Sequence, residues 1–208
     1  CTVVGRLGVG LDNIDVGACE ARGIKVIPAT GANALSVAEY VICTAMLLLR
    51  GAYQSHGAMV QGQWPRNALS SGREIHGKTL GLIGFGSIGQ LTARLAQGLG
   101  MQVQAYDAMM EEDHPTFQST GVKWTKLDAL LASSDVISLH VPLLPSTQHL
   151  INVERLAQMK PGAVLINSAR GGVVDESAVA ASLRSGHLGG AALDVFKRSE
   201  EDTSELQL

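Results

Sequence analysis

Apolar and polar positions along the chain fall into two kinds of segment that alternate. Short apolar runs bounded by Gly, Pro or Asp are typical of buried parallel strands, and longer segments with apolar residues three and four positions apart are typical of helices. Strands are expected over residues 2–4, 24–27, 79–83, 101–106, 135–140, 163–167 and 190–193. Helices are expected over residues 13–21, 36–49, 88–99, 127–131, 153–159 and 175–183. Strands that alternate with helices predict an α/β fold with a doubly wound parallel sheet, whose ligands bind at the carboxyl ends of the strands.

Two segments fall outside this alternation, and one helix stands out within it. Residues 53–77 are polar and rich in Gly and predict a connecting arm, whereas residues 109–121 are acidic and irregular. The helix expected from Ser36 carries Glu39 three positions on, the spacing of a capping box. Its apolar content is nearly continuous through Leu49, so we expect it to be buried between two domains or two subunits.

The segment Thr79–Asp107 carries the most specific chemical signal. An apolar strand leads into GFGSIG (Gly84–Gly89), a helix follows, Gly100 ends that helix, and a second strand ends at Asp107. In a dinucleotide-binding βαβ unit, the first glycine makes the tight turn, the second admits the pyrophosphate, and the third lets helix and strand pack closely. The free N–H groups of the helix would bind the phosphates. The apolar face expected for this helix consists of Ile88, Leu91, Leu95 and Leu99.

Asp107 lies 18 residues after Gly89, where a carboxylate can accept hydrogen bonds from both ribose hydroxyls and would repel a 2′-phosphate. The alternative is a solvated carboxylate at the end of a strand. Strand, helix, second strand and terminal acid agree with one another, so the sequence predicts NAD rather than NADP as the cofactor.

Further candidate residues follow the other strands. Arg170 lies in the Gly-rich sequence NSARGGVVD, where its planar fork can face a carboxylate or carbonyl, although an ion pair with a surface acid explains it equally well. The N–H groups of Gly8, Val9 and Gly10 can form an anion-binding nest, and a tight turn between strand and helix is an equal alternative. We expect functional residues to gather after Ile83, Tyr106, Leu139, Ile166 and Leu193.

Other kinds of chemistry find little support. His140 ends a strand beside Pro142, and a His there is more often structural, holding backbone carbonyls near the nucleotide, than a general base. The remaining five His residues form no ligand cluster, so no metal site is expected. Ser168 lacks a G-x-S-x-G elbow and a suitably placed His, which argues against nucleophilic catalysis.

Composition narrows the class of protein. The 208 residues are 46% hydrophobic and 17% charged, ordinary values for a globular chain with an ample core. A net charge of −3 gives no basic footprint for nucleic acid or for an anionic membrane, and the longest apolar run, residues 40–49, is too short to span a bilayer. The three Cys residues show no metal or disulfide spacing and predict a cytoplasmic protein, with Cys43 as a small core residue.

These motifs, in this order, resemble the D-isomer-specific 2-hydroxyacid dehydrogenases. The resemblance runs from Cys1 to Phe196 and rests on residues 4–15, 36–39, 84–89, 139–143, 167–175 and 190–196. It implies hydride transfer between nicotinamide C4 and C2 of a small 2-hydroxy or 2-keto acid. Within the family, GRLGVGLDNIDV followed by PATGANALSVAEYV is most similar to the branch of the phosphoglycerate and sulfolactate dehydrogenases.

The resemblance also assigns roles. Arg170 would be the catalytic residue that holds the substrate carboxylate and carbonyl, and the amides of Gly8, Val9 and Gly10 would hold the other carboxylate oxygens. The residues that would bind the cofactor or line its nicotinamide and ribose are Gly84, Gly86, Ser87, Ile88, Gly89, Asp107, His140, Val141, Pro142, Ser168, Ala169 and Asp194.

The same resemblance divides the chain. Residues 1–33 correspond to the C-terminal part of a flavodoxin-like substrate-binding domain, and residues 34–196 to the NAD-binding domain. The family's catalytic pair is a Glu shortly after ALDVF and a His in a later Pro-His motif. The Glu position falls on Ser199, and no such His follows. We therefore expect a fragment that binds NAD(H) weakly and is inactive as given.

Residues 197–208 fall outside the resemblance. The last eleven, RSEEDTSELQL, match RSEEHTSELQS, the translation of a common sequencing-library adapter, at all but Asp202 and Leu208. This match predicts a non-native tail from adapter read-through. A natural acidic tail is the alternative.

Two expectations concern partners. A homodimer is expected through residues 36–49 and the arm, with a small 2-hydroxy acid as substrate. The rival interpretation is a non-catalytic NAD(H)-sensing module on the same fold, comparable to a transcriptional corepressor. Arg170 and the glycine-rich loop fit both, but no basic or peptide-docking segment is visible.

Overall fold

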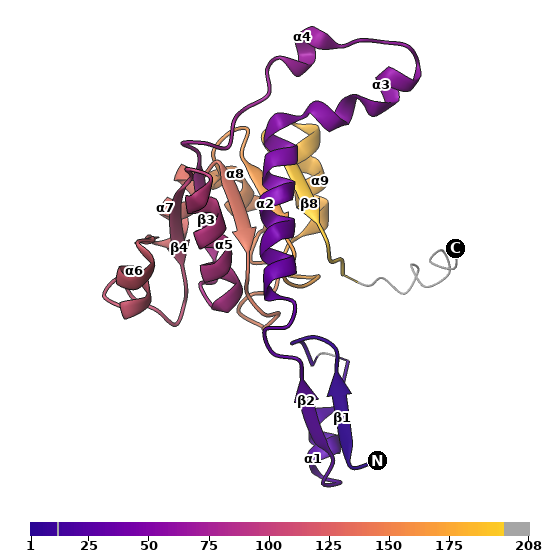
Figure 1. Ribbon diagram of the computed structural model, residues 1–208, viewed down its shortest axis with the longest axis vertical. Coiled ribbons are helices and arrows are strands. Elements are labelled where there is room, and N and C mark those ends of the chain that lie inside the picture. The colour runs from indigo at the N-terminus through magenta and orange to yellow at the C-terminus, as the bar shows by residue number, and fades with distance from the viewer. Residues whose placement is uncertain (12, 198–208) are drawn as a thin grey trace.

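Six parallel strands form the central sheet in the order β5-β4-β3-β6-β7-β8 (Figure 1). The computed structural model describes residues 1–11 and 13–197. From β3 the chain builds outward to β5, then returns to β6 on the other side of β3, so the strand order reverses between β3 and β6. Ligands bind at such a reversal, outside the carboxyl ends of the strands. The strands are β3 (Thr79–Ile83), β4 (Gln102–Tyr106), β5 (Lys123–Trp124), β6 (Val136–Leu139), β7 (Val164–Asn167) and β8 (Gly190–Leu193).

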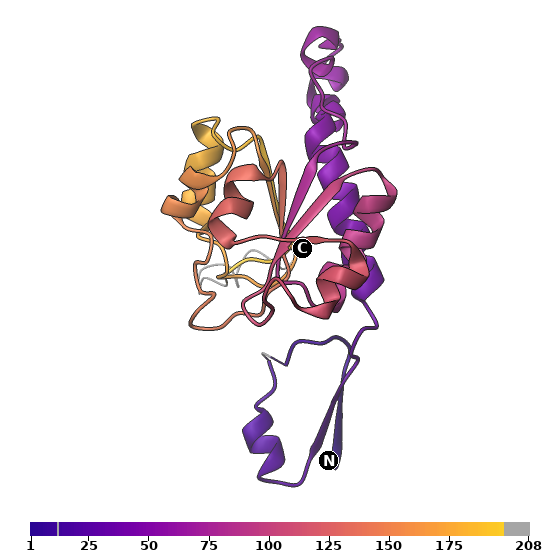
Figure 2. The ribbon, with the colours of Figure 1, turned by 90° about the vertical axis from the view of Figure 1, so that its left-hand side faces the viewer.

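Helices cover both faces of this sheet (Figure 2). Buried apolar side chains accordingly form two clusters, one around Leu80 and Leu82 and the other around Ile83 and Ile137. Burial on both faces explains why the strands read as continuous apolar runs rather than as alternating ones. The helices on the first face are α2 (Ala34–Arg50), α5 (Ser87–Gly98) and α6 (Pro115–Thr120), and those on the second are α7 (Leu127–Ser133), α8 (Val153–Gln158) and α9 (Glu176–Arg184).

The N-terminal residues form a separate small unit. Strands β1 (Val3–Arg6) and β2 (Lys25–Pro28) pair in parallel and are connected by α1 (Val16–Glu20). Asp15 caps α1, since its Oδ1 accepts a hydrogen bond from Ala18 N at 2.8 Å. No described residue of these three elements is buried. The unit connects to α2 near the carboxyl ends of the central strands (Figure 1).

An arm projects from the opposite end of the molecule (Figure 1). The segment expected to be a connecting arm contains η1 (Ala52–Ser55), α3 (His56–Val60) and α4 (Arg66–Leu69). It returns to the domain by a close backbone contact, because a Cβ on Gly72 would lie 2.4 Å from Arg50 O.

Two details of the expected helices are wrong. The long helix begins at Ala34, not after Ser36, and Asn33 occupies the N-cap position without a side-chain cap hydrogen bond. The turn bonds Ala32 N to Ala29 O and Ala34 N to Gly31 O lead the backbone directly into the helix, so Ser36 lies in its first turn.

The expected apolar face of α5 is also wrong. Its fully buried residues are Gly89, Thr92, Ala93 and Ala96, whereas Leu91 and Leu95 are half-buried and Leu99 is exposed. Small side chains let α5 approach the sheet and α2 closely, so they occupy the face where larger residues would not fit.

Besides the three short helices of the arm, the sequence prediction missed two elements, and it misplaced one cysteine. Residues 109–121 were expected to be irregular but contain α6, and the edge strand β5 follows them. Cys43 is exposed rather than a core residue. The buried side of α2 is formed by Ala38, Val41, Ile42, Ala45 and Leu49, and Cys43 points away from it because it lies two positions past Val41.

Candidate functional site

The three glycines of the loop after β3 meet three different environments. Gly84 has φ +95°, and a Cβ there would lie 2.5 Å from His140 O. A Cβ on Gly89 would lie 2.5 Å from Gly84 O, so helix and strand pack closely at this point. A Cβ on Gly86, in contrast, would meet nothing within 4 Å. The protein's own packing does not require Gly86, and the open space beside it fits the close approach of a pyrophosphate.

The N-terminus of α5 opens onto the same loop. Gly86 is its N-cap residue, and no side chain caps the first turn. Ser87 is exposed and Ile88 is half-buried at this end. The first N–H groups of a helix lack partners within the helix, and together with the positive end of its dipole they suit an anion. Loop and helix therefore fit the phosphates of a dinucleotide.

Asp107 follows β4 at the same edge of the sheet, held by two backbone groups. Its Oδ2 accepts a hydrogen bond from Phe85 N at 2.8 Å, and its Oδ1 accepts one from Met109 N at 2.9 Å. Each carboxylate oxygen keeps a further lone pair. The carboxylate can thus accept two hydroxyl groups, as NAD requires, and its charge opposes a 2′-phosphate.

A cleft of about 510 Å³ lies at the carboxyl ends of the strands. It brings together residues that are far apart in the sequence, from the loop after β1 to Val195 after β8. Ten of the predicted site residues line it: Gly8, Val9, Gly10, Ile88, His140, Val141, Pro142, Ser168, Ala169 and Arg170. Asp194 is not among the lining residues; it is exposed after β8, where its N–H donates to Asn167 O.

The loop that carries Arg170 is braced by the buried side chain of Asn167. Its Nδ2 donates to Arg170 O at 3.0 Å, and its Oδ1 accepts from Ala169 N at 3.1 Å. Arg170 is half-buried, and its Nη1 donates to Ala169 O at 2.6 Å. The hydroxyl of Ser168 is buried without a hydrogen-bond partner in the described structure, an orphaned polar group beside the cleft that a bound ligand could satisfy.

The loop after β1 is shaped by Arg6. Arg6 Nε donates to Gly10 O at 3.2 Å and Arg6 Nη1 to Leu7 O at 3.1 Å. Gly8 has φ +140°, and its N–H donates to Arg6 O. Because the Gly8 N–H is engaged in this bond, we expect an anion at this loop to be bound mainly by the N–H groups of Val9 and Gly10.

His140 is a neutral residue of the cleft wall. Burial lowers the pKa of His140 to about 4. Its Nε2 is 3.0 Å from Ser138 Oγ. Among the described residues the ring therefore pairs with a side chain, whereas the sequence had predicted that it holds backbone carbonyls. A group with this pKa is a weak base at neutral pH, which agrees with a structural role.

Sequence reasoning gave no role to three polar residues that the structure brings to the site. Arg6 and Asn33 line the cleft, and Asn167 supports its floor. Arg6 and Asn167 lie inside two of the segments that resemble the family, residues 4–15 and 167–175. The resemblance could therefore have indicated both residues. Asn33 precedes the helix expected from Ser36, so the sequence offered no reason to place it at the site. In the structure it is the N-cap residue of α2 and lines the cleft.

Residues 1–11 and 13–197 contain no group of three or more His, Cys, Asp or Glu side chains arranged to hold a metal ion. Within the same ranges, no helix is long and apolar enough to cross a membrane. Ser199, the position matched to the family's Glu, and the proposed read-through tail lie outside the described residues.

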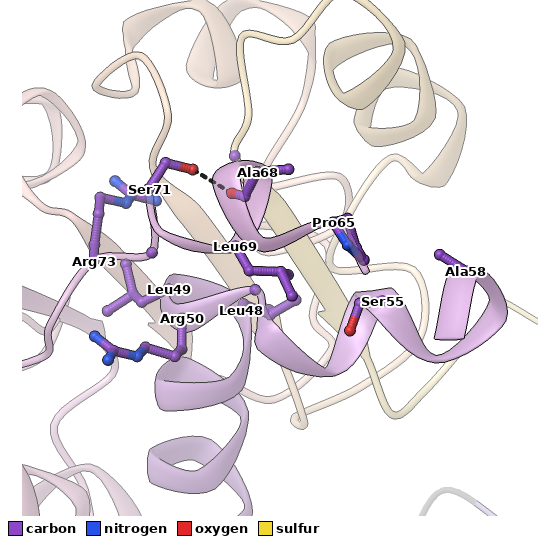
Figure 3. A pocket seen from close by; sticks show the side chains of 13 residues that line it. Leu48, Leu49, Arg50, Ser55, Ala58, Pro65, Ala68, Leu69, Ser71 and Arg73 are labelled. Carbon is purple, nitrogen blue, oxygen red and sulfur yellow. Dashed lines mark hydrogen bonds between the residues drawn. The ribbon is translucent and has the colours of Figure 1, made fainter. Parts of the chain in front are cut away.

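A second cavity, of about 460 Å³, lies at the root of the arm (Figure 3). Two of its polar side chains bond within the chain: Arg73 Nη2 donates to Gly162 O at 2.7 Å, and Ser71 Oγ donates to Ala68 O at 2.7 Å. It lies near the amino ends of the strands, away from the glycine-rich loop. It therefore lacks the features that make the cleft at the carboxyl ends a candidate site.

The reversed strand order, the three glycine environments and the fixed Asp107 define a Rossmann-type dinucleotide-binding protein. The chain belongs to the D-isomer specific 2-hydroxyacid dehydrogenase family, because the sequence model of that family's NAD binding domain matches residues 42–207. NAD is accordingly the cofactor of the domain.

Individual relatives agree with this placement. The chain is 57% identical over 194 residues to (S)-sulfolactate dehydrogenase of Chromohalobacter salexigens, covering 93% of this chain and 62% of that protein. It is 46% identical over 193 residues to D-3-phosphoglycerate dehydrogenase of Haemophilus influenzae, covering 93% of this chain and 46% of that protein. The structure of D-lactate dehydrogenase from Aquifex aeolicus, complexed with NAD and lactic acid, matches with a TM-score of 0.83 at 37% identity, over 94% of this chain and 58% of that chain. The chain thus spans about half to two thirds of the length of these relatives.

Proposed function

We propose that this chain is the cofactor-binding part of an NAD-dependent oxidoreductase that moves a hydride between nicotinamide C4 and C2 of a small 2-hydroxy or 2-keto acid. The observation that carries the proposal is the cleft, which places Arg170 and the loop Gly8–Gly10 beside the end of the dinucleotide-binding strands. Bound NAD(H) would supply the hydride donor or acceptor. The protein's own residues hold the acid and orient its C2.

Arg170 is the residue proposed to bind the substrate. A guanidinium can form two parallel hydrogen bonds, to a carboxylate oxygen and to the oxygen on C2, which orients the carbon between them. Holding a developing negative charge on the C2 oxygen also lowers the barrier to hydride addition. The Val9 and Gly10 N–H groups would hold the second carboxylate oxygen.

The substrate is proposed to carry a second anionic group. Arg6 lines the same cleft as Arg170, so two cationic side chains border one ligand site. A sulfonate or phosphate on C3 of the acid would interact with Arg6, as in the substrates for which the sulfolactate and phosphoglycerate relatives are named. A plain 2-hydroxy acid such as lactate would leave Arg6 without that partner.

The experiment is steady-state kinetics on the complete protein with Arg170→Lys. We expect kcat/KM for the 2-keto acid to fall by roughly 10²-fold, because Lys cannot reproduce the planar fork. NADH affinity should be unchanged. Arg6→Gln should lower kcat/KM more for a dianionic substrate than for pyruvate, because pyruvate loses only the bonds by which Arg6 shapes the loop Gly8–Gly10. Complete protein that binds NADH but oxidises it with no 2-keto acid would favour the sensing module over the enzyme.

A homodimer is proposed through the outer face of α2 and the arm. Cys43, Met46, Leu47, Tyr53 and Ile75 line an open apolar groove of about 820 Å³ there. The arm also carries exposed Met59, Val60 and Trp64. Apolar surface of this extent is typical of an interface, and a second copy of the chain offers a matching surface. Sedimentation of the complete protein as a monomer would contradict the dimer.

A cytoplasmic location is also proposed, because the three cysteines are free, as is usual in a reducing compartment.

A further inference from the structure

The orientation of the Asp107 carboxylate depends on the glycine-rich loop. One of its oxygens is bound by the N–H of Phe85, the residue between Gly84 and Gly86, and the other by Met109 N. A carboxylate fixed on both oxygens does not lose side-chain freedom when a ligand binds. Movement of the Phe85 N–H would therefore change both the position and the rigidity of the acceptor that selects NAD.

Phe85 is in turn held by α6. Its ring is fully buried and stacks on the ring of Phe117, with centroids 5.1 Å apart and planes 10° apart. Phe117 is buried in α6, and Phe85 O accepts a hydrogen bond from Gln90 Nε2 at 3.0 Å. The stack is thus a direct contact between α6 and the loop expected to bind the pyrophosphate.

The other side of Asp107 is anchored independently. Asp107 and Met110 pair as an isolated antiparallel bridge, and Trp124 Nε1 donates to Met110 O at 3.1 Å. Strand β5 therefore holds the Met109 side of the carboxylate, and α6 holds the Phe85 side. Of these two supports, the Phe85–Phe117 stack is the one that also fixes the glycine-rich loop.

We propose that Phe117 is a positioning residue for the cofactor. Its ring fixes Phe85, and the Phe85 N–H aims the Asp107 carboxylate at the adenosine ribose. The inference rests on the domain's use of NAD but not on any substrate or on hydride transfer. It follows that α6 sets the preference for NAD over NADP through a side chain buried behind the loop.

The test compares cofactor affinities in this chain, measured by calorimetry for NADH and by displacement of NADH for NADPH. Phe117→Leu keeps an apolar side chain in place but removes the ring stack. We expect it to weaken NADH binding roughly 3- to 10-fold, the size of an aromatic-pair contribution. NADPH, which cannot use the Asp107 carboxylate in the same way, should change by less than about twofold, so the preference ratio falls.

The matched control is Leu156→Ala, a buried residue of α8 on the other face of the sheet. It should lower the melting temperature at least as much as Phe117→Leu and leave the ratio of affinities unchanged. Phe117→Tyr, which retains the ring, should restore the wild-type ratio.

Three results would overturn the inference. Phe117→Leu could weaken NADH and NADPH equally, it could change neither, or Leu156→Ala could lower the ratio as much. If the wild-type chain bound no NADH at all, the proposed cofactor would fail and this inference with it. If instead the wild-type chain bound NADH and the Phe117 variants kept the same preference for NADH over NADPH, only the role of Phe117 would be refuted. Phe117→Leu decides the question even if a harsher Phe117→Ala does not fold.

Discussion

At the scale of single residues, the glycines of the GFGSIG loop separate packing from ligand binding. A Cβ on Gly89 would collide with Gly84 O, whereas a Cβ on Gly86 would point into open space. We expect Gly89→Ala to lower the free energy of unfolding by about 1–3 kcal/mol, as overpacking does. Gly86→Ala should change it by less than about 0.5 kcal/mol.

The same pair should show the reverse difference in cofactor binding. In the folded protein, Gly86→Ala should weaken NADH binding roughly tenfold or more, because a displaced pyrophosphate loses more than one hydrogen bond of about 1 kcal/mol. Urea unfolding and calorimetric titration check the two expectations. A Gly86→Ala variant with wild-type affinity would show that the pyrophosphate does not approach this glycine.

His140 makes the folded state sensitive to acid. Its pKa falls from 6.5 to about 4 in the folded state. Between these values the unfolded chain takes up a proton that the folded chain does not, so stability falls as the pH falls from about 6.5 towards 4. The loss should reach about 3 kcal/mol, at 1.4 kcal/mol for each unit. About 2 kcal/mol of this loss should be present at pH 5, 1.5 units below the unfolded pKa of 6.5. Urea unfolding of wild type and of His140→Gln at pH 7.5 and pH 5 measures it, and equal losses in the two proteins would contradict the assignment.

At the scale of elements, a single carboxylate ties the amino ends of three strands together. Asp135, just before β6, accepts hydrogen bonds from Thr79 N of β3 at 2.9 Å and from Lys160 Nζ, before β7, at 2.7 Å. Burial of Asp135 would raise its pKa, but the hydrogen bonds from Lys160 and Thr79, together with the charges of Lys160 and Lys78, outweigh burial and lower it. The stabilisation is therefore complete above the unfolded pKa of 3.8 and is lost at more acid pH.

The two ends of this tie should differ in strength. Asp135 is nearly buried, so Asp135→Ala leaves Thr79 N without its partner and should cost about 2 kcal/mol of stability. The side chain of Lys160 is about half exposed, and Lys160→Ala should cost roughly 0.2–1 kcal/mol. Thermal or urea unfolding of the two variants checks the order. A larger loss for Lys160→Ala would mean that the charge, not the backbone bond, dominates.

The elements that the sequence predicted well are those with long apolar runs. Strand β3 has the expected bounds, because burial on both faces makes its apolar run continuous. Strand β8 has them too, although it lies at the edge of the sheet and three of its four residues are only half-buried. Strand β5 has only two residues and escaped notice, since two residues carry no periodicity. The face of α5 was misjudged because a hydrophobicity pattern rewards large side chains, whereas close packing of this helix on the sheet requires small ones.

The site residues that could be predicted from the sequence are those that lie in glycine-rich loops or at the ends of strands. The positions of Gly84, Gly86 and Gly89 relative to Asp107 follow from the spacing of a βαβ unit. The side-chain contacts that hold the site residues in place could not be predicted. Nothing in the sequence pairs Phe85 with Phe117, or His140 with Ser138. Such contacts depend on where α6 and the strand ends lie in three dimensions.

At the scale of the whole molecule, stability should be uneven. The unit of residues 1–33 contains no buried described residue in its strands or helix, whereas the strands β3, β6 and β7 are enclosed on both faces. Local opening needs little free energy where few apolar contacts are lost. Amide hydrogen exchange of this chain should therefore be fast over β1 and β2 and slow over β3, β6 and β7. Equal protection in both parts would contradict this account.

NMR chemical shifts that map NADH binding onto the chain test most directly whether the dinucleotide lies at the carboxyl ends of the strands. We expect the shifts to gather there, at Gly84–Gly89, Asp107, His140–Pro142 and Ser168–Arg170. They should be much weaker with NADPH. Shifts that gather instead around Leu48, Arg50 and Leu69, in the cavity at the root of the arm, would contradict that location (Figure 3).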